Sequence, residues 1–225
     1  MGSNAKTVFI TGGSTGIGAA CVRKFVKEGW NVAFMDINVE DGTKLAGETG
    51  ALFVEGSTRC REDLDRAVDA ACKAFGGLNT VVANAGIHRC NTMLDISEEE
   101  LDLMIDTNIK GTVHTLRAAV PHILENGGGS VVINASDQCY VGKSNSFGYG
   151  LTKGALGQIT KSLAIDLGPK GVRVNAVCAG TIRTPLTEHG NMMKKACREF
   201  SDRLCCFVEK TGLPPWRTEA ALLPV

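Results

Sequence analysis

The amino-acid sequence predicts an α/β fold, in which one parallel β-sheet carries helices on both of its faces. The first observation is that short apolar runs rich in Val, Ile and Phe alternate with longer runs in which apolar residues recur at helical spacing. Alternation of this kind is typical of right-handed β-α-β crossovers. The second observation is that the first apolar run, Val8 to Ile10, leads through a glycine-rich turn into a helical pattern. Together these observations predict a doubly wound sheet.

Six strands and five helices are expected to alternate along the chain. The strands are expected near residues 7–11, 31–36, 51–55, 80–83, 130–134 and 172–178. The helices are expected near residues 16–28, 39–47, 61–75, 97–126 and 148–167. Ser97, followed by Glu98, Glu99 and Glu100, has the pattern of a capping box at the start of the long helix, and the three glycines at 127–129 end that helix.

The length of the chain and its carboxyl-terminal residues determine the domain organisation that we expect. With 225 residues and 44% hydrophobic content, the chain is long enough for one sizeable core and too short for a second full domain. We therefore predict a single domain over residues 1–225. Residues 187–225 hold one cationic, cysteine-rich helical pattern, Met192 to Val208, and no strand-like run.

Composition and charge exclude several classes of function. Lys and Arg together number 24, as do Asp and Glu, so the net charge of zero gives no reason to expect nucleic acid or an anionic membrane as a partner. Apart from Cys205 and Cys206, the nine cysteines are scattered, and they do not group with the histidines, so we expect no metal site. The sequence shows neither a signal-peptide core nor a membrane-spanning run. We expect a cytoplasmic protein with reduced thiols.

The glycine-rich turn reads Thr11-Gly12-Gly13-Ser14-Thr15-Gly16-Ile17-Gly18. Glycines there let the backbone approach a pyrophosphate, and free N–H groups at the start of the next helix favour an anion. The second strand ends in Asp36, where a carboxylate accepts hydrogen bonds from the adenosine ribose and repels a 2′-phosphate. This predicts a Rossmann-type site for NAD rather than NADP; a solvated strand-end carboxylate is the alternative. Candidate cofactor contacts in this part of the chain are Gly12, Ser14, Thr15, Gly16, Ile17, Gly18, Asp36 and Ile37.

Tyr149 and Lys153 are spaced i, i+4 ahead of apolar residues at helical period, so they are expected on one face of a helix. A tyrosine has a pKa of about 10, and using it as a proton acceptor at neutral pH takes about 4 kcal/mol of preferential stabilisation of the phenolate. A neighbouring ammonium is a direct source of that stabilisation. The pair therefore suggests acid–base chemistry. The alternative is a half-buried tyrosine beside a solvated lysine.

The carboxyl ends of the predicted strands, where ligands bind in such sheets, carry small or polar residues. Strand four ends in Asn84-Ala85-Gly86, strand five in Asn134-Ala135-Ser136, and strand six in Cys178-Ala179-Gly180-Thr181. Asn108 lies in the middle of the long helix, and Tyr149 follows Ser136 by thirteen residues. With the glycine-rich turn and Lys153, this arrangement resembles the short-chain dehydrogenase/reductase family over residues 6–186.

The resemblance implies a role for each matching residue. Tyr149 would be the general base in alcohol oxidation and the general acid in ketone reduction, while Lys153 would lower its pKa and hold the nicotinamide ribose. Ser136 would hydrogen-bond the substrate oxygen, with a strand-end cap as the alternative. Asn108 would anchor a water that relays protons, with a solvent-facing side chain as the alternative. Further cofactor contacts are implied for Asn84, Ala85, Gly86, Gly180, Ile182 and Thr184, besides Tyr149 and Lys153.

Three features depart from the family pattern. Ser57, kept as a candidate cofactor contact, stands where an adenine-contacting aspartate is frequent. Ala179 stands where a proline is common after strand six. Residues 187–225 form an atypical tail without the helix and the seventh strand that family members normally have, so we expect the sheet edge to be open or closed by a partner chain.

The sequence therefore predicts an NAD-dependent oxidoreductase for small or medium secondary alcohols or ketones. An NAD-binding regulator without catalysis, or a truncated and impaired isoform, is the alternative. Candidate residues of the substrate pocket are Ile87, His88, Asp137, Gln138, Cys139, Val141, Leu186, His189 and Met192. Apolar residues on the outer faces of the two longest helices predict a homo-oligomer, a dimer or a tetramer; these residues are Val113, Leu116, Val120, Leu151, Ala155 and Ile159.

Overall fold

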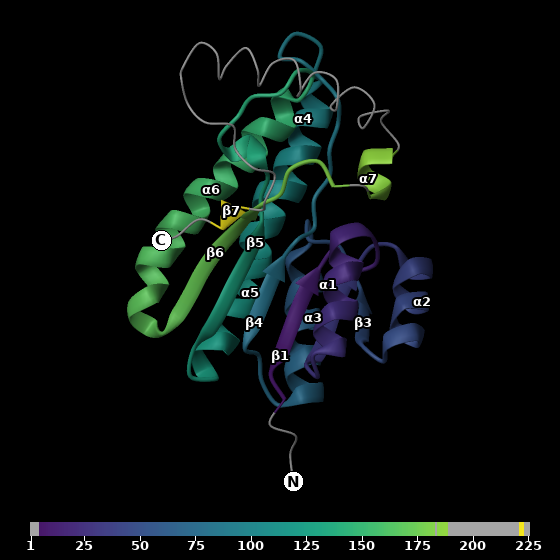
Figure 1. Ribbon diagram of the computed structural model, residues 1–225, viewed down its shortest axis with the longest axis vertical. Coiled ribbons are helices and arrows are strands. Elements are labelled where there is room, and N and C mark those ends of the chain that lie inside the picture. Colours follow the sequence, from purple (N-terminus) through teal and green to yellow (C-terminus); the bar gives the residue numbers. More distant parts are fainter. Residues whose placement is uncertain (1–4, 183, 189–220, 223–225) are drawn as a thin grey trace.

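The computed structural model describes residues 5–182, 184–188 and 221–222. Its centre is one seven-stranded sheet with the strand order β3-β2-β1-β4-β5-β6-β7 (Figure 1). The strands are β1 (Thr7–Thr11), β2 (Asn31–Asp36), β3 (Leu52–Glu55), β4 (Thr80–Ala83), β5 (Gly129–Asn134), β6 (Val172–Cys178) and β7 (Ala221–Leu222). The first six strands pair in parallel. The predicted doubly wound parallel sheet is thereby confirmed.

The direction in which strands are added reverses at β1. This strand pairs with β2 on one side, for example at Val8↔Val32, and with β4 on the other, at Val8↔Thr80. In open α/β sheets, ligands bind beyond the carboxyl ends of the strands at such a switch point. The parallel strands all end at the upper edge of the sheet in Figure 1. The turns that follow β1, β2, β4 and β5 are therefore neighbours, although they are far apart in the sequence.

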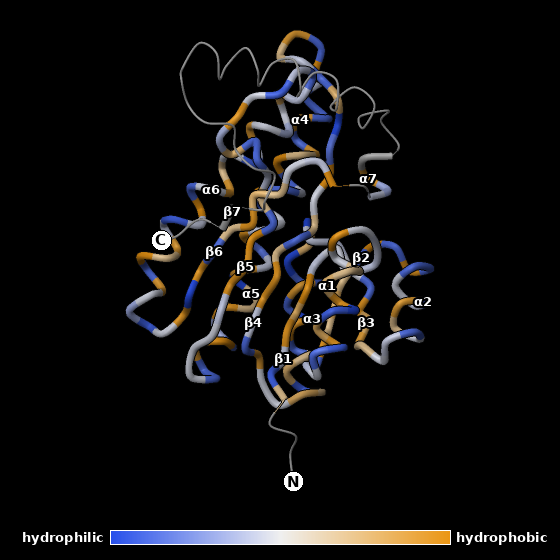
Figure 2. Tube along the Cα trace, viewed as in Figure 1, coloured by the Kyte–Doolittle hydropathy of each residue, from blue (hydrophilic) through white to orange (hydrophobic). Residues whose placement is uncertain are grey.

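Helices cover both faces of the sheet. They are α1 (Gly16–Lys27), α2 (Val39–Thr49), α3 (Arg61–Phe75), α4 (Glu98–Met104), α5 (Gly111–Glu125), α6 (Phe147–Leu167) and α7 (Pro185–Glu188). Helices α1 and α2 pack on one face, where Val22 and Leu45 join the buried ring of Phe34. Helices α3, α5 and α6 pack on the other face, where Leu64 and Leu156 are buried. Figure 2 shows the hydrophobic residues along β1, between these two helical layers.

The long helix expected over residues 97–126 is divided. Helix α4 passes into a π-helical segment, η1 (Ile105–Lys110), and this segment passes into α5. Ser97 caps the start as predicted, because its side chain accepts a hydrogen bond from the Glu100 N–H. Single π-helical turns occur frequently at functional sites. Asn108 lies in η1 and is fully buried, so the alternative of a solvent-facing asparagine is wrong.

Besides the six parallel strands that were expected, the sheet has a two-residue strand at its edge. Strand β7 pairs antiparallel with the end of β6, at Val177↔Leu222 and Cys178↔Ala221. A run of two residues is too short to show the alternation by which strands are recognised in a sequence. His189 and the helical pattern Met192 to Val208 lie outside the described residues. In the part of the chain that the structure describes, no helix is long and apolar enough to span a bilayer.

Candidate active site

The glycine-rich turn brings the start of α1 against the ends of β1 and β4. Gly12 and Gly16 have φ values of 65° and 53°, a conformation that glycine adopts without strain. A Cβ at Gly12 would meet the Ala85 backbone at 2.7 Å, and one at Gly18 would overlap the Gly12 carbonyl oxygen. Among the described residues, the side chain of the N-cap residue Thr15 makes no capping bond. The first turn of α1 therefore presents its backbone N–H groups beside a close-packed glycine cradle.

Asp36, at the end of β2, faces the glycine-rich turn. Its carboxylate accepts hydrogen bonds from the backbone N–H of Ser14 at 2.9 Å and of Asn38 at 3.0 Å. Each carboxylate oxygen has a second lone pair, so both oxygens can also accept from a hydroxyl group. Ile37, the next residue, has 72% of its surface exposed. Asp36 is thus held in the turn and half-buried, rather than free in solvent as in the alternative interpretation.

Side-chain hydrogen bonds join the ends of β1, β4 and β5. Asn84 Nδ2 donates to the carbonyl oxygens of Thr11 at 3.0 Å and Gly12 at 2.9 Å, and Asn84 Oδ1 accepts from Asn134 Nδ2 at 2.8 Å. Thr11 Oγ1 accepts from the N–H groups of Asn84 and Ala85. This network fixes the turn after β4 beside the glycine-rich turn. No motif in the sequence predicts these roles of the Thr11 and Asn134 side chains, and their place at strand ends is the signal that points to them.

Asn108 connects the segment after β4 to helix α6. Its Oδ1 accepts from the Ile87 N–H at 2.8 Å, and its Nδ2 donates to the Ile87 carbonyl at 3.0 Å and to Thr152 Oγ1 at 2.9 Å. Thr112 Oγ1 donates to the Asn108 backbone carbonyl at 2.7 Å. The side chain thus donates both of its N–H groups and accepts one hydrogen bond, which fixes its orientation. Thr152, which no sequence motif indicates, precedes Lys153 on α6 and follows Tyr149 by three residues.

Tyr149 and Lys153 lie together near the start of α6, as their spacing predicts. Lys153 is only 4% exposed, so the alternative of a solvated lysine is wrong. Its Nζ donates to the Asn134 carbonyl oxygen at 2.7 Å and lies 5.6 Å from the centroid of the Tyr149 ring. The ammonium therefore lies over the ring and is bonded to the end of β5.

The pKa of Tyr149 differs from the sequence-based expectation. Burial raises it to about 12, a hydrogen bond with Ser136 opposes the rise, and the charges of Asp137 and Cys139 add to it. Burial also lowers the pKa of Lys153 to about 8. Desolvation of the phenol is thus the largest effect on the pKa of Tyr149. The phenol therefore carries its proton at neutral pH in this structure.

Ser136 links Tyr149 to an ion pair. It is 5% exposed, and it precedes the 3-10 turn η2 (Asp137–Cys139). Ser136 Oγ donates to Asp137 Oδ1 at 2.9 Å and accepts from the Gln138 N–H at 3.2 Å. Asp137 Oδ2 lies 2.7 Å from Lys143 Nζ. Ser136 is thus both the cap that the alternative interpretation proposes and a partner of the Tyr149 phenol.

His88, from the turn after β4, packs on Tyr149. The two ring centroids are 4.6 Å apart in an edge-on arrangement, and His88 Nε2 lies 3.2 Å from Ser146 Oγ. Burial, together with the charges of Arg89 and Lys143, lowers the pKa of His88. At neutral pH the imidazole is therefore uncharged and packs against the phenol ring.

The segment after β6 crosses the same edge of the sheet. A Cβ at Gly180 would meet Asp137 Oδ2 at 3.9 Å, and one at Gly16 would meet the Thr184 side chain at 3.3 Å. Ile182, between them, is 47% exposed. This segment therefore extends from the Ser136 side of the site to the glycine-rich turn.

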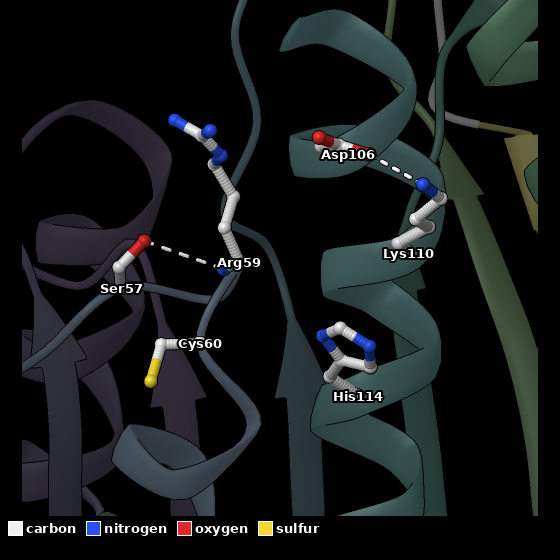
Figure 3. Close-up of a pocket in the computed structure, with 6 residues that line it drawn as sticks. All are labelled: Ser57, Arg59, Cys60, Asp106, Lys110 and His114. Carbon is white, nitrogen blue, oxygen red and sulfur yellow. Dashed lines mark hydrogen bonds and ion pairs between the residues drawn. The ribbon is translucent and has the colours of Figure 1, made fainter. Parts of the chain in front are cut away.

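Ser57 lies between two hollows at the opposite end of the crevice, and its N–H donates to Asp63 Oδ2 at 2.9 Å. Figure 3 shows the first hollow, of about 400 Å³, which is lined by Ser57, Arg59, Cys60, Asp106, Lys110 and His114. The second hollow, of about 480 Å³, is lined by Ile37, Glu55, Gly56, Ser57, Asp63 and Arg66. Two of the expected adenosine contacts, Ile37 and Ser57, thus border one hollow.

A sequence profile described as short chain dehydrogenase matches residues 6–195. The chain belongs to this family. It is 38% identical over 185 residues to the 3-alpha-(or 20-beta)-hydroxysteroid dehydrogenase of Mycobacterium tuberculosis (strain ATCC 25618 / H37Rv). The matched region covers 81% of this chain and 71% of that protein. It is 38% identical over 188 residues to the L-fucose dehydrogenase of Mus musculus, covering 82% of this chain and 68% of that protein.

Solved structures of the short-chain dehydrogenase fold give the same result. The NADH complex of a 3-ketoacyl-(acyl-carrier-protein) reductase from Brucella melitensis has a TM-score of 0.78 at 33% identity, covering 80% of this chain and 77% of that one. The aldohexose dehydrogenase of Thermoplasma acidophilum has a TM-score of 0.77 at 31% identity, and the match covers 84% of this chain and 71% of that one.

As a short-chain dehydrogenase, the protein is an oxidoreductase that acts on alcohol or ketone groups with a nicotinamide cofactor. The described residues fit such a dinucleotide. A Cβ would fill the cradle at Gly12 and Gly18, and the lone pairs of Asp36 are suited to ribose hydroxyl groups.

Proposed function

We propose that this short-chain dehydrogenase transfers a hydride between NAD and a small or medium secondary alcohol or ketone. The proposed catalytic residues are Asn108, Ser136, Tyr149 and Lys153. The observation that carries the proposal is the buried Lys153, whose ammonium lies 5.6 Å from the centroid of the Tyr149 ring and bonds the end of β5, beside the buried Ser136 hydroxyl. Two hydroxyl groups that converge on one point can bind a carbonyl or alcohol oxygen and stabilise the charge that develops there.

Tyr149 and Ser136 would act directly on the substrate oxygen. In ketone reduction the phenol gives its proton to that oxygen, while the Ser136 hydroxyl donates a hydrogen bond to it. A bound nicotinamide would supply the hydride, or accept it in the reverse direction. A phenol with a pKa of about 12 holds its proton firmly at neutral pH, which suits a proton donor. In alcohol oxidation the phenolate is needed, and Lys153, 5.6 Å from the ring centroid, would stabilise it.

Asn108 would serve the site through its backbone and its side chain. Its side-chain bonds to Ile87 and Thr152 hold the turn after β4 against helix α6, and so hold Tyr149 in place. Asn108 would also anchor the water that relays protons.

The cofactor would lie across the carboxyl ends of the strands. Its pyrophosphate would be held at Gly12, Ser14, Thr15, Gly16, Ile17 and Gly18, and its adenosine at Asp36, Ile37 and Ser57. Its nicotinamide half would be held at Asn84, Ala85, Gly86, Tyr149, Lys153, Gly180, Ile182 and Thr184.

Asp36 supports the choice of NAD over NADP, because its carboxylate would repel a 2′-phosphate. We expect the unmodified protein to bind NADH at least about tenfold more tightly than NADPH, a difference of about 1.4 kcal/mol. Replacing Asp36 by Ala and Ile37 by Arg should reverse this order, since the phosphate loses a like charge and gains a cation. Fluorescence titration measures both affinities, and equal values in the unmodified protein would contradict the assignment.

The activity itself is tested by following NADH absorbance with a panel of alcohols. The panel contains hydroxysteroids and sugars, since the relatives are named for such substrates, together with cyclic alcohols and polyols. Tyr149→Phe should abolish turnover and leave NADH binding intact, because only the proton-transfer group is lost. A Tyr149→Phe protein that keeps more than about a tenth of kcat would refute the role of the phenol. NADH binding without turnover of any alcohol would favour the regulator alternative.

We also propose a homo-oligomer, although three of the six residues predicted for its interface do not support it. Leu116 is 5% exposed and part of the core, and Val120 and Ile159 pack against that core, so these three residues do not form an outer face. Leu151, at 45% exposure, and Ile165, at 73%, remain on the surface of α6. We expect light scattering at micromolar concentration to show a dimer or a tetramer, and a stable monomer would contradict this proposal.

A further inference from the structure

His88 is held against Tyr149 from outside the helix that carries the tyrosine. The centroids of the two rings are 4.6 Å apart and the ring planes make an angle of 62°, so the contact is T-shaped. On its other side, His88 Nε2 lies at a hydrogen-bond distance of 3.2 Å from Ser146 Oγ. Ser146 is 6% exposed, so this bond is shielded from water. The imidazole is thus bonded at one nitrogen and packed against the phenol ring at the same time.

The backbone that carries His88 is fixed on both sides of this residue. Before it, the Ile87 N–H donates to Asn108 Oδ1 at 2.8 Å, and the Ile87 carbonyl accepts from Asn108 Nδ2 at 3.0 Å. After it, Arg89 Nη1 donates to the His88 carbonyl oxygen at 3.0 Å. The imidazole therefore projects from a backbone whose own groups are already bonded, and its place beside Tyr149 is well defined.

Asn91 fastens the same segment onto the first turn of α6. The Asn91 N–H donates to the Asn145 carbonyl at 3.1 Å, and the Asn91 carbonyl accepts from the Phe147 N–H at 3.1 Å. Asn91 Oδ1 accepts from the Gly148 N–H at 3.2 Å. This N–H group belongs to the first turn, where a helix offers no backbone acceptor of its own. Asn91 is 4% exposed, and it therefore caps α6 from a distant part of the chain.

The cap from Asn91 leaves the Ser146 hydroxyl for a different partner. Ser146 is the N-cap residue of α6, and serine is a common residue at this position. In the described part of the chain, however, its side chain makes no capping bond. Its hydroxyl faces His88 instead, three residues before Tyr149. The start of α6 thus holds the imidazole, and the imidazole packs on the residue of α6 that is proposed to transfer the proton.

We propose that His88 is a positioning residue, which is held by Ser146 and keeps the Tyr149 ring in the orientation needed for proton transfer. This proposal rests on the oxidoreductase function proposed above, and it adds a residue that acts through Tyr149. Rotation of Tyr149 about its Cα–Cβ bond would carry the hydroxyl away from the substrate oxygen, and the imidazole beside the ring opposes this rotation. A misplacement of about 1 Å can cost about a hundredfold in rate.

The first test compares His88→Ala with His122→Ala. Both histidines are half-buried, but His122 lies on α5 beside Asp69 and Glu125. We expect kcat of His88→Ala to fall by about tenfold to a hundredfold, by the same factor for two alcohols of different size, with KM and NADH affinity unchanged. His122→Ala should behave as the wild type. An unchanged kcat, or a rise in KM that differs between the two alcohols, would overturn the positioning role.

Ser146→Ala tests the hydrogen bond that holds the imidazole. This change leaves the cap of α6 in place, because that cap is made by Asn91. In the wild-type background we expect kcat to fall by about threefold to tenfold, the effect of one lost hydrogen bond. In the His88→Ala background the same change should cause no further loss. Ser162→Ala, at an exposed position on the same helix, is the control. Equal losses in both backgrounds would show that Ser146 acts independently of His88, and would overturn the proposal.

His88→Phe separates ring packing from the loss of side-chain volume. A phenylalanine ring can restore an edge-on contact with the phenol, whereas alanine cannot. We expect kcat of His88→Phe to exceed that of His88→Ala by at least about fivefold. If the two variants are equally slow, the ring contact does not position Tyr149.

A measurement without turnover separates this proposal from the proposed function. The chain has two tyrosines, Tyr140 and Tyr149, so a Tyr140→Phe background leaves one tyrosine signal. Exchange between the two ε-carbon resonances of Tyr149 reports how tightly its ring is held. We expect ring rotation to be at least about tenfold faster in His88→Ala than in His122→Ala. An unchanged rate overturns the positioning role, whereas a faster rate in a protein that oxidises no alcohol contradicts the proposed function alone.

Discussion

Replacing Lys153 by Met should stabilise the protein at neutral pH while removing its activity. Lys153 is 4% exposed, and burial lowers its pKa from 10.5 to about 8. At about 1.4 kcal/mol per pKa unit, protonated Lys153 destabilises the folded state by about 3 kcal/mol. Met fills a similar volume without a charge, but it leaves the Asn134 carbonyl oxygen without the Lys153 bond of 2.7 Å, which costs about 1 to 2 kcal/mol. The net gain in the free energy of unfolding should be about 1 to 2 kcal/mol.

The pH dependence gives this prediction a definite sign. The folded-state pKa of Lys153 is lowered, so the folded protein favours the neutral amine. The destabilisation by Lys153 is therefore absent above pH 10.5, develops as the pH falls, and is complete below about pH 8. The wild type should therefore gain up to about 3 kcal/mol relative to Lys153→Met as the pH rises from about 7 to 10. Taking the difference between the two proteins cancels the titration of other groups.

Urea unfolding at several pH values measures both quantities, with a constant m-value as the check on two-state behaviour. Lys161→Met, at an exposed position on the same helix, is the matched control and should change stability by less than about 0.5 kcal/mol. If Lys153→Met is less stable than the wild type at pH 7, or if their difference does not vary with pH, burial of the charge does not dominate at this position.

Three further predictions test the packing and titration of the site. Gly18→Ala should lower the free energy of unfolding by about 3 kcal/mol and abolish NADH binding, since its Cβ would overlap the Gly12 carbonyl oxygen. Gly47→Ala is the control, because its Cβ would have no described atom within 4 Å, and it should stabilise α2 by about 0.5 to 1 kcal/mol. Urea unfolding measures both changes. Asn108→Ala should lower the free energy of unfolding by about 3 to 4 kcal/mol, because buried partners lose three hydrogen bonds, and a loss below about 1 kcal/mol would contradict this. The pKa of Tyr149 is raised, so its contribution to stability is present below pH 10 and is lost as the pH rises through about 12. Between these pH values the free energy of unfolding of the wild type should fall by up to about 3 kcal/mol more than that of Tyr149→Phe.

The strands and helices of the fold could be predicted because their signals are local. β1, β2, β4 and β6 have the bounds expected from the apolar runs, and the alternation of strands and helices predicts a parallel sheet. The glycine-rich turn and Asp36 could likewise be recognised, since glycine spacing and a strand-end carboxylate are visible in the sequence. The i, i+4 spacing of Tyr149 and Lys153 placed them on one helix for the same reason.

The partners and the burial of these residues were decided by the tertiary structure. The i, i+4 spacing suggested that Lys153 lowers the pKa of Tyr149, but desolvation of the buried phenol raises it. Leu116 has the spacing of an outer-face residue and yet lies in the core, and β7 is too short to form a pattern. The contact of the His88 ring with Tyr149 joins the turn after β4 to α6. Periodicity is a property of neighbouring residues, whereas desolvation and hydrogen-bond direction depend on atoms that distant parts of the chain bring to the same place.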